Sequence, residues 1–262
     1  IKTVTLKAKG LHMPVNEFEH TLDSNCLFQS LPRVVLRRLL PGTELVDLLL
    51  EQVLYESSET IRWVYFPTTA IISMLCVLEN EDSAEIAIVG REGMTGVFLF
   101  MSTRNVPNRT VVQSAGQAYR IDAAAFNAEF YRVGALFTLM MRYTQALITQ
   151  MTQTAVCYRH HTVEQQLCRW LLLSLDRLNG NALDMTQELI ANMLGVRREG
   201  VTEAAGRLQR DGLIQYSRGH IEILDRERLE GRVCECYQVV KTEFDRLLPV
   251  GDHRAKSKHR NN

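Results

Sequence analysis

The residues whose types and spacing most clearly indicate a chemical role lie in the last third of the chain. Arg197 and Arg198 stand at the start of a predicted helix over residues 198–210, and Glu199 follows them directly. A guanidinium group can donate two hydrogen bonds to guanine, and a carboxylate can accept one from a cytosine amino group. This end of the helix is therefore predicted to contact base edges in the major groove of DNA.

Another predicted helix precedes this one and would position it. Thr186 can accept a hydrogen bond from the first-turn amides of that helix, and Glu188 favours its positive end. Gly195 can adopt the left-handed conformation that a tight turn between two helices requires. The pattern predicts a helix-turn-helix.

Two short alternating segments follow, over residues 213–216 and 220–223, and predict a β-hairpin. Such a hairpin beside a helix-turn-helix is a wing, and Arg218 at its tip is placed to contact phosphate. The residues predicted to contact DNA are Thr186, Gln187, Arg197, Arg198, Glu199, Thr202, Glu203 and Arg218.

The first half of the chain predicts a different kind of domain. A short helical lead-in over Asn25–Leu40 ends at Pro41-Gly42, which cannot continue a helix. Short β-branched and aromatic segments then recur about every ten residues and favour a small antiparallel barrel or sandwich. The predicted strands are Ile61–Phe66, Ala70–Leu78, Glu85–Val89, Thr110–Gln113 and Gln117–Ile121.

Helical periodicity returns at Asp122, the predicted N-cap of a helix over Ala123–Tyr131, and a long helix over Ala135–Arg159 follows. Its apolar stripe has the alternating steps of four and three with which a helix packs against a parallel copy of itself. The alternative is that the stripe packs on its own barrel. The predicted dimerisation residues are Leu136, Met140, Tyr143, Leu147, Met151 and Thr154.

The composition sets limits on partners. The 262 residues have a formal net charge of zero, so DNA binding must depend on a local patch of positive charge. No apolar run reaches the roughly 20 residues that cross a bilayer, and the first residues lack the features of a secretory signal. A cytoplasmic protein without a membrane partner is expected.

No enzyme motif is present, since the chain lacks Gly-x-Ser-x-Gly, His-Glu-x-x-His and a P-loop, and no catalytic residue is predicted. The six cysteines are scattered without any Cys-x-x-Cys. Cys234 and Cys236 fall in a predicted helix that Asp225 caps and that extends to about Leu248, where residues two apart point to different faces. His160-His161 follows the long helix, and histidines at a helix end usually form hydrogen bonds or interact with the helix dipole. A haem or metal role for them is the alternative, and no metal site is predicted.

The segment from Thr186 to Ile214 resembles the DNA-binding signature of the Crp–Fnr family of bacterial regulators, and Glu85–Gly96 resembles that family's β-roll sensor domain. The resemblance covers nearly the whole chain from about Asn25. It implies an α+β fold with an N-terminal antiparallel β-roll of the jelly-roll type, a long dimerisation helix and a C-terminal winged helix-turn-helix. It also implies a homodimer on a roughly palindromic DNA site, with RNA polymerase as a further partner.

The sensor motif departs from the cyclic-nucleotide binders of that family. They carry Gly-Glu-Leu, whereas this chain has Gly96-Val97-Phe98, so the glutamate that binds the ribose is missing and cyclic AMP is not expected. A cyclic dinucleotide such as cyclic di-GMP, or no cofactor or ligand at all, are the alternatives. The residues that the resemblance would place at a ligand are Gly96, Arg109, Thr110, Thr152 and Gln153.

The predicted organisation has five parts. Residues 1–24 are a leader or cloning-derived disordered segment, 25–134 the sensor domain, 135–160 the dimerisation helix, 161–250 the winged helix-turn-helix domain, and 251–262 a basic disordered tail. The predicted function is sequence-specific regulation of transcription through effector-dependent geometry of the recognition helices. The alternative is a cyclic-nucleotide or cyclic-dinucleotide sensor whose winged helix docks a protein instead of DNA.

Overall fold

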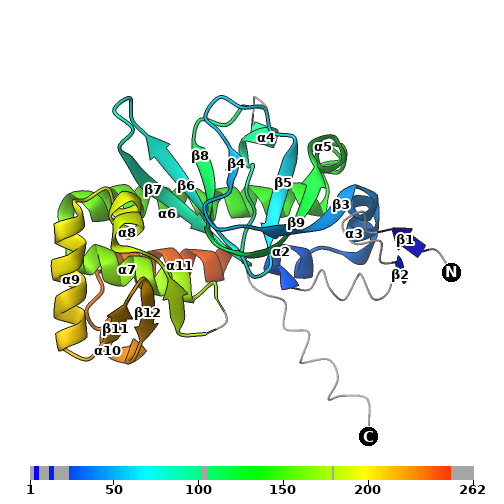
Figure 1. The fold of residues 1–262 in the computed structure, drawn as a ribbon. Coiled ribbons are helices and arrows are strands. Elements are labelled where there is room, and N and C mark those ends of the chain that lie inside the picture. Colours follow the sequence, from blue (N-terminus) through cyan, green and yellow to red (C-terminus); the bar gives the residue numbers. More distant parts are fainter. Residues whose placement is uncertain (1–2, 6–11, 15–23, 102–104, 179, 249–262) are drawn as a thin grey trace, which may run out of the picture.

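The structure is a computed structural model that describes residues 3–5, 12–14, 24–101, 105–178 and 180–248. A β-roll and a helix-turn-helix unit lie at opposite ends of the molecule, and one long helix connects them (Figure 1). The expected α+β fold with antiparallel sheets is confirmed. The predicted tail over residues 251–262 lies outside the described residues, as does most of the predicted leader. Within that leader Thr3–Thr5 (β1) and His12–Pro14 (β2) pair as a short antiparallel ribbon.

The β-roll consists of two antiparallel sheets. Most residues of β5 and β8 are buried in consecutive positions, so these strands contribute to the core of the β-roll. One sheet has the order β3-β9-β5, from Thr43–Leu48, Gly116–Asp122 and Trp63–Pro67. The other has the order β4-β8-β6-β7, from Val53–Tyr55, Arg109–Ser114, Ile71–Val77 and Ser83–Val89.

Aromatic rings fill the interior of the β-roll. Phe28 stacks on Phe66 with ring centroids 4.4 Å apart, and Phe100 stacks on Phe130 at 4.6 Å. Phe66 belongs to β5, and the other three rings come from helices that cover the sheets. The covering helices are Cys26–Gln29 (α2), Arg33–Leu39 (α3), Phe98–Met101 (α4) and Ala123–Phe130 (α5), with a 3-10 turn over Leu40–Gly42 (η2).

The long helix α6 runs over Ala135–His160 and is bonded to the sensor domain along its length. The Tyr143 hydroxyl donates to the Met94 carbonyl oxygen at 2.7 Å, and the Gln150 amide donates to the Ile88 carbonyl oxygen at 3.1 Å. Near the end of α6 the Tyr158 hydroxyl lies 3.0 Å from the carbonyl oxygens of both Glu85 and Met193. The helix therefore connects the β-roll to the helix-turn-helix.

The C-terminal unit packs around the helix α7, Val163–Leu175, whose Trp170 is almost completely buried. A three-stranded antiparallel sheet with the order β10-β12-β11 closes its far side. Its elements are Ala182–Asp184 (β10), Gln187–Leu194 (α8), Arg198–Arg210 (α9), Ile214–Ser217 (β11), His220–Ile223 (β12), Arg226–Glu230 (α10) and Cys236–Leu247 (α11).

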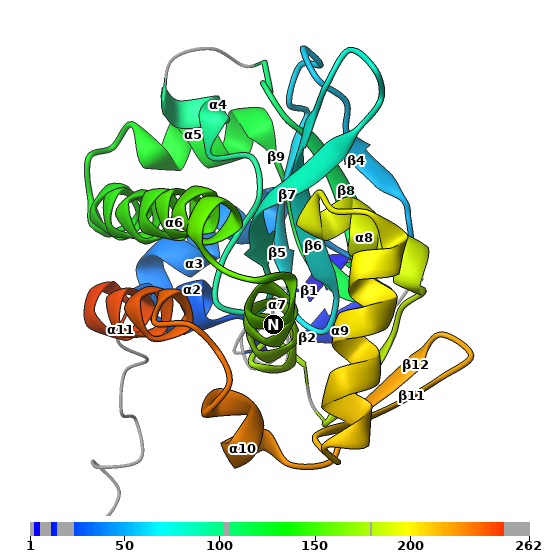
Figure 2. The same cartoon turned by 90° about the vertical axis from the view of Figure 1, so that its left-hand side faces the viewer.

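One helix prediction is wrong. The segment that Asp225 caps ends at Glu230, and a new helix, α11, begins at Cys236, because the intervening turn contains Gly231. Helix α11 then lies beside α6 (Figure 2). Within the part of the chain that the structure describes, no helix has both the length and the apolar character needed to cross a bilayer.

The predicted dimerisation stripe also needs correction. The side chains of Leu136, Met140, Tyr143, Leu147 and Thr154 are buried, and Met151 is half-buried, within their own chain. They face the β-roll and α11. The alternative given above, that the stripe packs on its own barrel, therefore describes them better. The opposite face of α6 is exposed and has the same steps of three and four. Its residues are Thr138, Met141, Gln145, Ile148, Thr152 and Ala155.

Candidate DNA-binding surface

Helices α8 and α9 form a helix-turn-helix with the predicted boundaries. The Thr186 hydroxyl accepts a hydrogen bond from the Leu189 amide at 3.2 Å and caps α8. Gly195 ends α8 with φ 64° and ψ 35°, which is the left-handed conformation predicted for it. Burial of Val201, Ala205 and Leu208 holds α9 on the domain, as predicted. The opposite face of α9 is therefore free to meet a partner.

The arginine-led end of α9 is exposed. Arg197 is the N-cap residue, and the Arg198 side chain is 64% exposed with its Nε 4.0 Å from Glu188. Glu199 is also exposed. Helix α9 forms one edge of the molecule, on the side away from the described N-terminal strands (Figure 1). The two arginines and Glu199 are thus brought together on one accessible surface.

Other residues of α8 and α9 that were predicted to contact DNA form hydrogen bonds within the protein. The Thr202 hydroxyl donates to the Gln187 side-chain oxygen at 2.7 Å, which fixes the crossing of the two helices. Glu203 accepts from Arg207 at 2.6 Å, and this guanidinium also binds Glu164 of α7 at 2.6 Å. Arg207 therefore offsets the negative charge of Glu203, which would otherwise repel DNA phosphates.

The wing is attached to α9 by a contact that the sequence did not indicate. The Gln209 side-chain oxygen accepts from the Tyr216 amide at 2.7 Å, and the Tyr216 hydroxyl donates to the Met185 carbonyl at 2.7 Å. Exposed Arg218 occupies the hairpin tip with φ 51°, and Gly219 follows with φ 82°. This two-residue turn with positive φ is typical of a tight hairpin, and it presents Arg218 on the wing.

The turn of the helix-turn-helix also touches the sensor domain. A Cβ on Gly195 would lie 3.1 Å from the Ala84 Cβ, on the hairpin between β6 and β7. A cavity of about 410 Å³ lies beside this contact, and Asp82 and Arg197 both line it. The sensor hairpin and the DNA-binding unit are therefore neighbours, although no sequence pattern indicated this contact.

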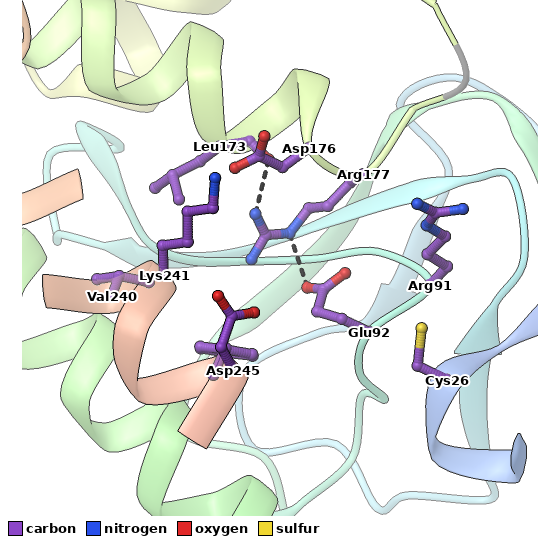
Figure 3. A pocket seen from close by; sticks show the side chains of 10 residues that line it. Cys26, Arg91, Glu92, Leu173, Asp176, Arg177, Val240, Lys241 and Asp245 are labelled. Carbon is purple, nitrogen blue, oxygen red and sulfur yellow. Dashed lines mark hydrogen bonds and ion pairs between the residues drawn. The ribbon is translucent and has the colours of Figure 1, made fainter. Parts of the chain in front are cut away.

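A second junction between the two units is an ion pair. Arg177 of the C-terminal unit donates to Glu92 of the sensor at 2.7 Å, and its side chain is only 5% exposed (Figure 3). Gly90 makes room for it, because a Cβ there would lie 2.6 Å from the Arg177 Cβ. The pair borders a cavity of about 280 Å³ between the sensor, α7 and α11, which Lys241 and Asp245 also line.

The five residues considered for a nucleotide do not converge. Arg109 pairs with Glu56 at 3.2 Å, and Thr110 beside it is buried in β8. Thr152 lies on the exposed face of α6 and donates to the Ile148 carbonyl of its own helix. Gln153 is half-buried on α6, and Gly96, with φ 92°, packs its Cα region against Val64 and Tyr55. None of the five is hydrogen-bonded to another, and none lines the two cavities described above.

The prediction of one continuous helix through Cys234 and Cys236, which excluded a shared metal, is wrong. Helix α11 begins at Cys236, and Cys234 belongs to the preceding turn. Both side chains point toward Cys157 and His161 at the end of α6. Sequence reasoning missed this group because its halves are more than 70 residues apart, as the separation of Cys157 from Cys234 shows.

Replacing Gly195 with alanine tests the local geometry of the turn. The left-handed backbone and the nearby Ala84 both oppose a Cβ, so we expect the free energy of unfolding to fall by about 1–2 kcal/mol. Gly206→Ala is the matched control, because that glycine lies within α9 with open space around it. Alanine there should instead raise stability by about 0.5–1 kcal/mol in urea unfolding. A stable Gly195→Ala variant would contradict the assigned turn.

Comparison with known proteins agrees with this geometry. Residues 165–232 match the family model of the Crp-like helix-turn-helix domain, so the C-terminal unit is of the Crp-like helix-turn-helix class. No curated protein matches the sequence.

Several solved structures share the fold of most of the chain. A protein from Eubacterium rectale, described as a transcriptional regulator of the Crp/Fnr family, has 15% identity and a TM-score of 0.64 over 80% of this chain and 98% of its own. FixK2 from Bradyrhizobium japonicum has 14% identity and a TM-score of 0.62 over 73% and 98%. The c-di-GMP responsive regulator CLP from Xanthomonas campestris has 13% identity and a TM-score of 0.55 over 73% and 99%. The chain thus has the fold of Crp/Fnr transcriptional regulators.

Proposed function

We propose that this protein is a homodimeric regulator of transcription that binds a specific, roughly palindromic DNA site through α9 and the wing. The observation that carries the proposal is the N-terminal end of α9, where the side chains of Arg197, Arg198 and Glu199 are all exposed in the described part of the chain. The inserted end of a recognition helix has this arrangement, with base-reading side chains in its first turn. Arg218 on the wing would add a phosphate contact.

The local charge of this surface fits the proposal better than the net charge does. The protein as a whole has no net charge, so it is not drawn to DNA from a distance. Arg197, Arg198 and Arg218 are nevertheless all exposed on the surface formed by α9 and the wing. Binding should therefore depend on a few phosphate contacts and on base contacts that select the sequence.

A DNA titration tests the proposal. The probe is a duplex from the region upstream of the protein's own gene, and fluorescence anisotropy is measured at two salt concentrations against a scrambled duplex of equal length. Selective binding that weakens as salt rises supports the proposal, because each neutralised phosphate releases counterions. Equal affinity for both duplexes, or binding to neither, would instead favour the hypothesis that the winged helix docks a protein.

The proposed dimer uses the exposed face of α6. Met141 and Ile148 are apolar residues on that face, exposed by 39% and 52%, and α11 borders it through the bond between Gln145 and Glu243. Apolar positions at steps of three and four are those by which two parallel helices pack. A pair of chains joined there would present two α9 helices to one duplex.

An aspartate at the centre of this face should dissociate the dimer. In Ile148→Asp the two carboxylates would face each other across the seam, and we expect the dimer dissociation constant to rise at least tenfold in sedimentation equilibrium, or about 1.4 kcal/mol. Val34→Asp is the control, because Val34 is also an exposed helical residue, at 60%, but lies on α3. An Ile148→Asp variant that stays dimeric would exclude this face as the dimer interface.

A further inference from the structure

Four potential metal ligands meet where the end of α6 lies against the start of α11. Cys157 and His161 come from α6 and its C-cap, and Cys234 and Cys236 come from the turn before α11 and its first residue. Their sulfur and nitrogen atoms all lie within 4.8 Å of one another. We propose that these four side chains bind one Zn²⁺ ion.

The distances within the group match a tetrahedral zinc site. Zinc binds cysteine sulfur at about 2.3 Å and histidine nitrogen at about 2.0–2.1 Å, so a tetrahedron places two sulfurs about 3.8 Å apart and a sulfur and a nitrogen about 3.5 Å apart. The sulfurs of Cys157 and Cys234 are 3.6 Å apart. The Cys236 sulfur is likewise 3.6 Å from His161 Nδ1. The side chains therefore already surround a position of the size that one ion requires.

Burial separates this group from solvent. Cys157 and Cys236 are completely buried and Cys234 is 4% exposed, while the His161 side chain is 15% exposed. Three thiolates, a neutral histidine and Zn²⁺ carry one net negative charge, which is costly to bury without a cation nearby. Arg169 supplies that cation, because its guanidinium is buried and interacts electrostatically with Cys157 and Cys236.

The Glu235 carboxylate orients the His161 ring. While Nδ1 of His161 faces the Cys236 sulfur, Nε2 lies 3.4 Å from the Glu235 carboxylate, which is on the same turn as the two cysteines. Histidines that bind metals commonly donate their other ring N–H to a carboxylate in this way. This contact fixes Nδ1 as the ligand atom.

Closed sites of one histidine and three cysteines are structural, because no coordination position is left for a substrate. Here the ion would crosslink the end of α6 to α11, and so hold the C-terminal unit at a fixed orientation to the long helix. The proposal concerns metal content and fold, and it stands whether or not the protein binds DNA.

The first test is metal analysis of the full chain. The protein is purified without a histidine tag, under reducing conditions, and its metals are measured by mass spectrometry. We expect about one zinc per chain. Replacement of zinc by Co²⁺ should produce the thiolate-to-cobalt charge-transfer absorption and the visible bands of a tetrahedral site. A chain that neither contains stoichiometric zinc nor gives these bands on Co²⁺ titration would overturn the proposal, as would an iron–sulfur spectrum or a Cys157–Cys234 disulfide.

Variants assign the ligands. Cys234→Ser, Cys236→Ser and His161→Ala should each lose the stoichiometric zinc and alter the cobalt spectrum, whereas two control variants should keep both. Cys168→Ser is the buried control, since Cys168 is fully buried on α7 outside the group, and Cys76→Ser is the exposed control. Retention of zinc by all three ligand variants would contradict the assignment. If a ligand variant fails to fold, the cobalt titration of the wild-type chain still decides the question.

Discussion

Replacing Arg198 with alanine is expected to weaken binding to a specific DNA site by about 5- to 140-fold, which corresponds to a loss of about 1–3 kcal/mol for one bidentate base contact. The side chain is exposed, and its nearest acidic neighbour, Glu188, is 4.0 Å away, so little intramolecular bonding is lost with it. The loss should be largest for the selected sequence and small for unrelated DNA, because an arginine that reads a base adds specificity.

The control for this variant is Arg62→Ala, which removes the same charge from an exposed position on the β-roll. Anisotropy titrations of both variants against the specific and the scrambled duplex separate base contacts from general attraction. An equal loss for both duplexes would assign Arg198 to phosphate contact. An unchanged affinity for the specific duplex would remove α9 as the recognition helix.

The stability of the protein is expected to fall as pH rises through neutrality, because of one buried carboxyl group. Burial raises the pKa of Glu85 to about 7, and the bond from Ser73 and the charges of Arg169 and Arg177 only partly oppose this effect. The folded state therefore binds this proton more tightly than the unfolded state does. The stabilisation is complete below the ordinary pKa near 4.5 and is lost as pH rises through about 7, a total of about 3 kcal/mol.

Glu85→Gln removes this titration. The free energy of unfolding of the variant, relative to wild type, should rise between about pH 4.5 and pH 8, and urea unfolding at a series of pH values measures it. Glu79→Gln is the control, since that carboxyl is exposed in the turn after β6, and its curve should follow wild type. If the Glu85→Gln curve ran parallel to wild type over the same range, the carboxyl would not be the source of the pH dependence.

The local features of the fold could be predicted because short-range chemistry determines them. Thr186, Gly195 and the arginines give α8 and α9 their observed ends, and Asp122 caps α5 as expected. The five predicted strands are present, with ends shifted by one or two residues. Five strands were not located, namely β1, β2, β3, β4 and β10. Four of these strands have only three residues each, and the sequence of β3 contains Glu44 and Asp47, which are uncommon in strands.

Contacts between distant segments could not be predicted in the same way. The stripe through Tyr143 has heptad spacing, but spacing alone does not say whether a helix packs on its own domain or on a copy. The metal-ligand group had a usable signal, because Cys157 and His161 are four residues apart and so share a helix face. The missing step was the break before α11 at the turn that contains Gly231, which brings Cys234 and Cys236 toward them.

The shared hydroxyl of Tyr158 has a consequence for movement between the two units. A phenol has a single proton, so at any moment it serves either the Glu85 carbonyl or the Met193 carbonyl, and never both. If α8 moved away from β7, the Tyr158 hydroxyl would donate to the Glu85 carbonyl oxygen, and the number of hydrogen bonds that it donates would be unchanged. The Tyr158 hydroxyl therefore forms a hydrogen bond with only one of the two units at a time, and does not join them to each other.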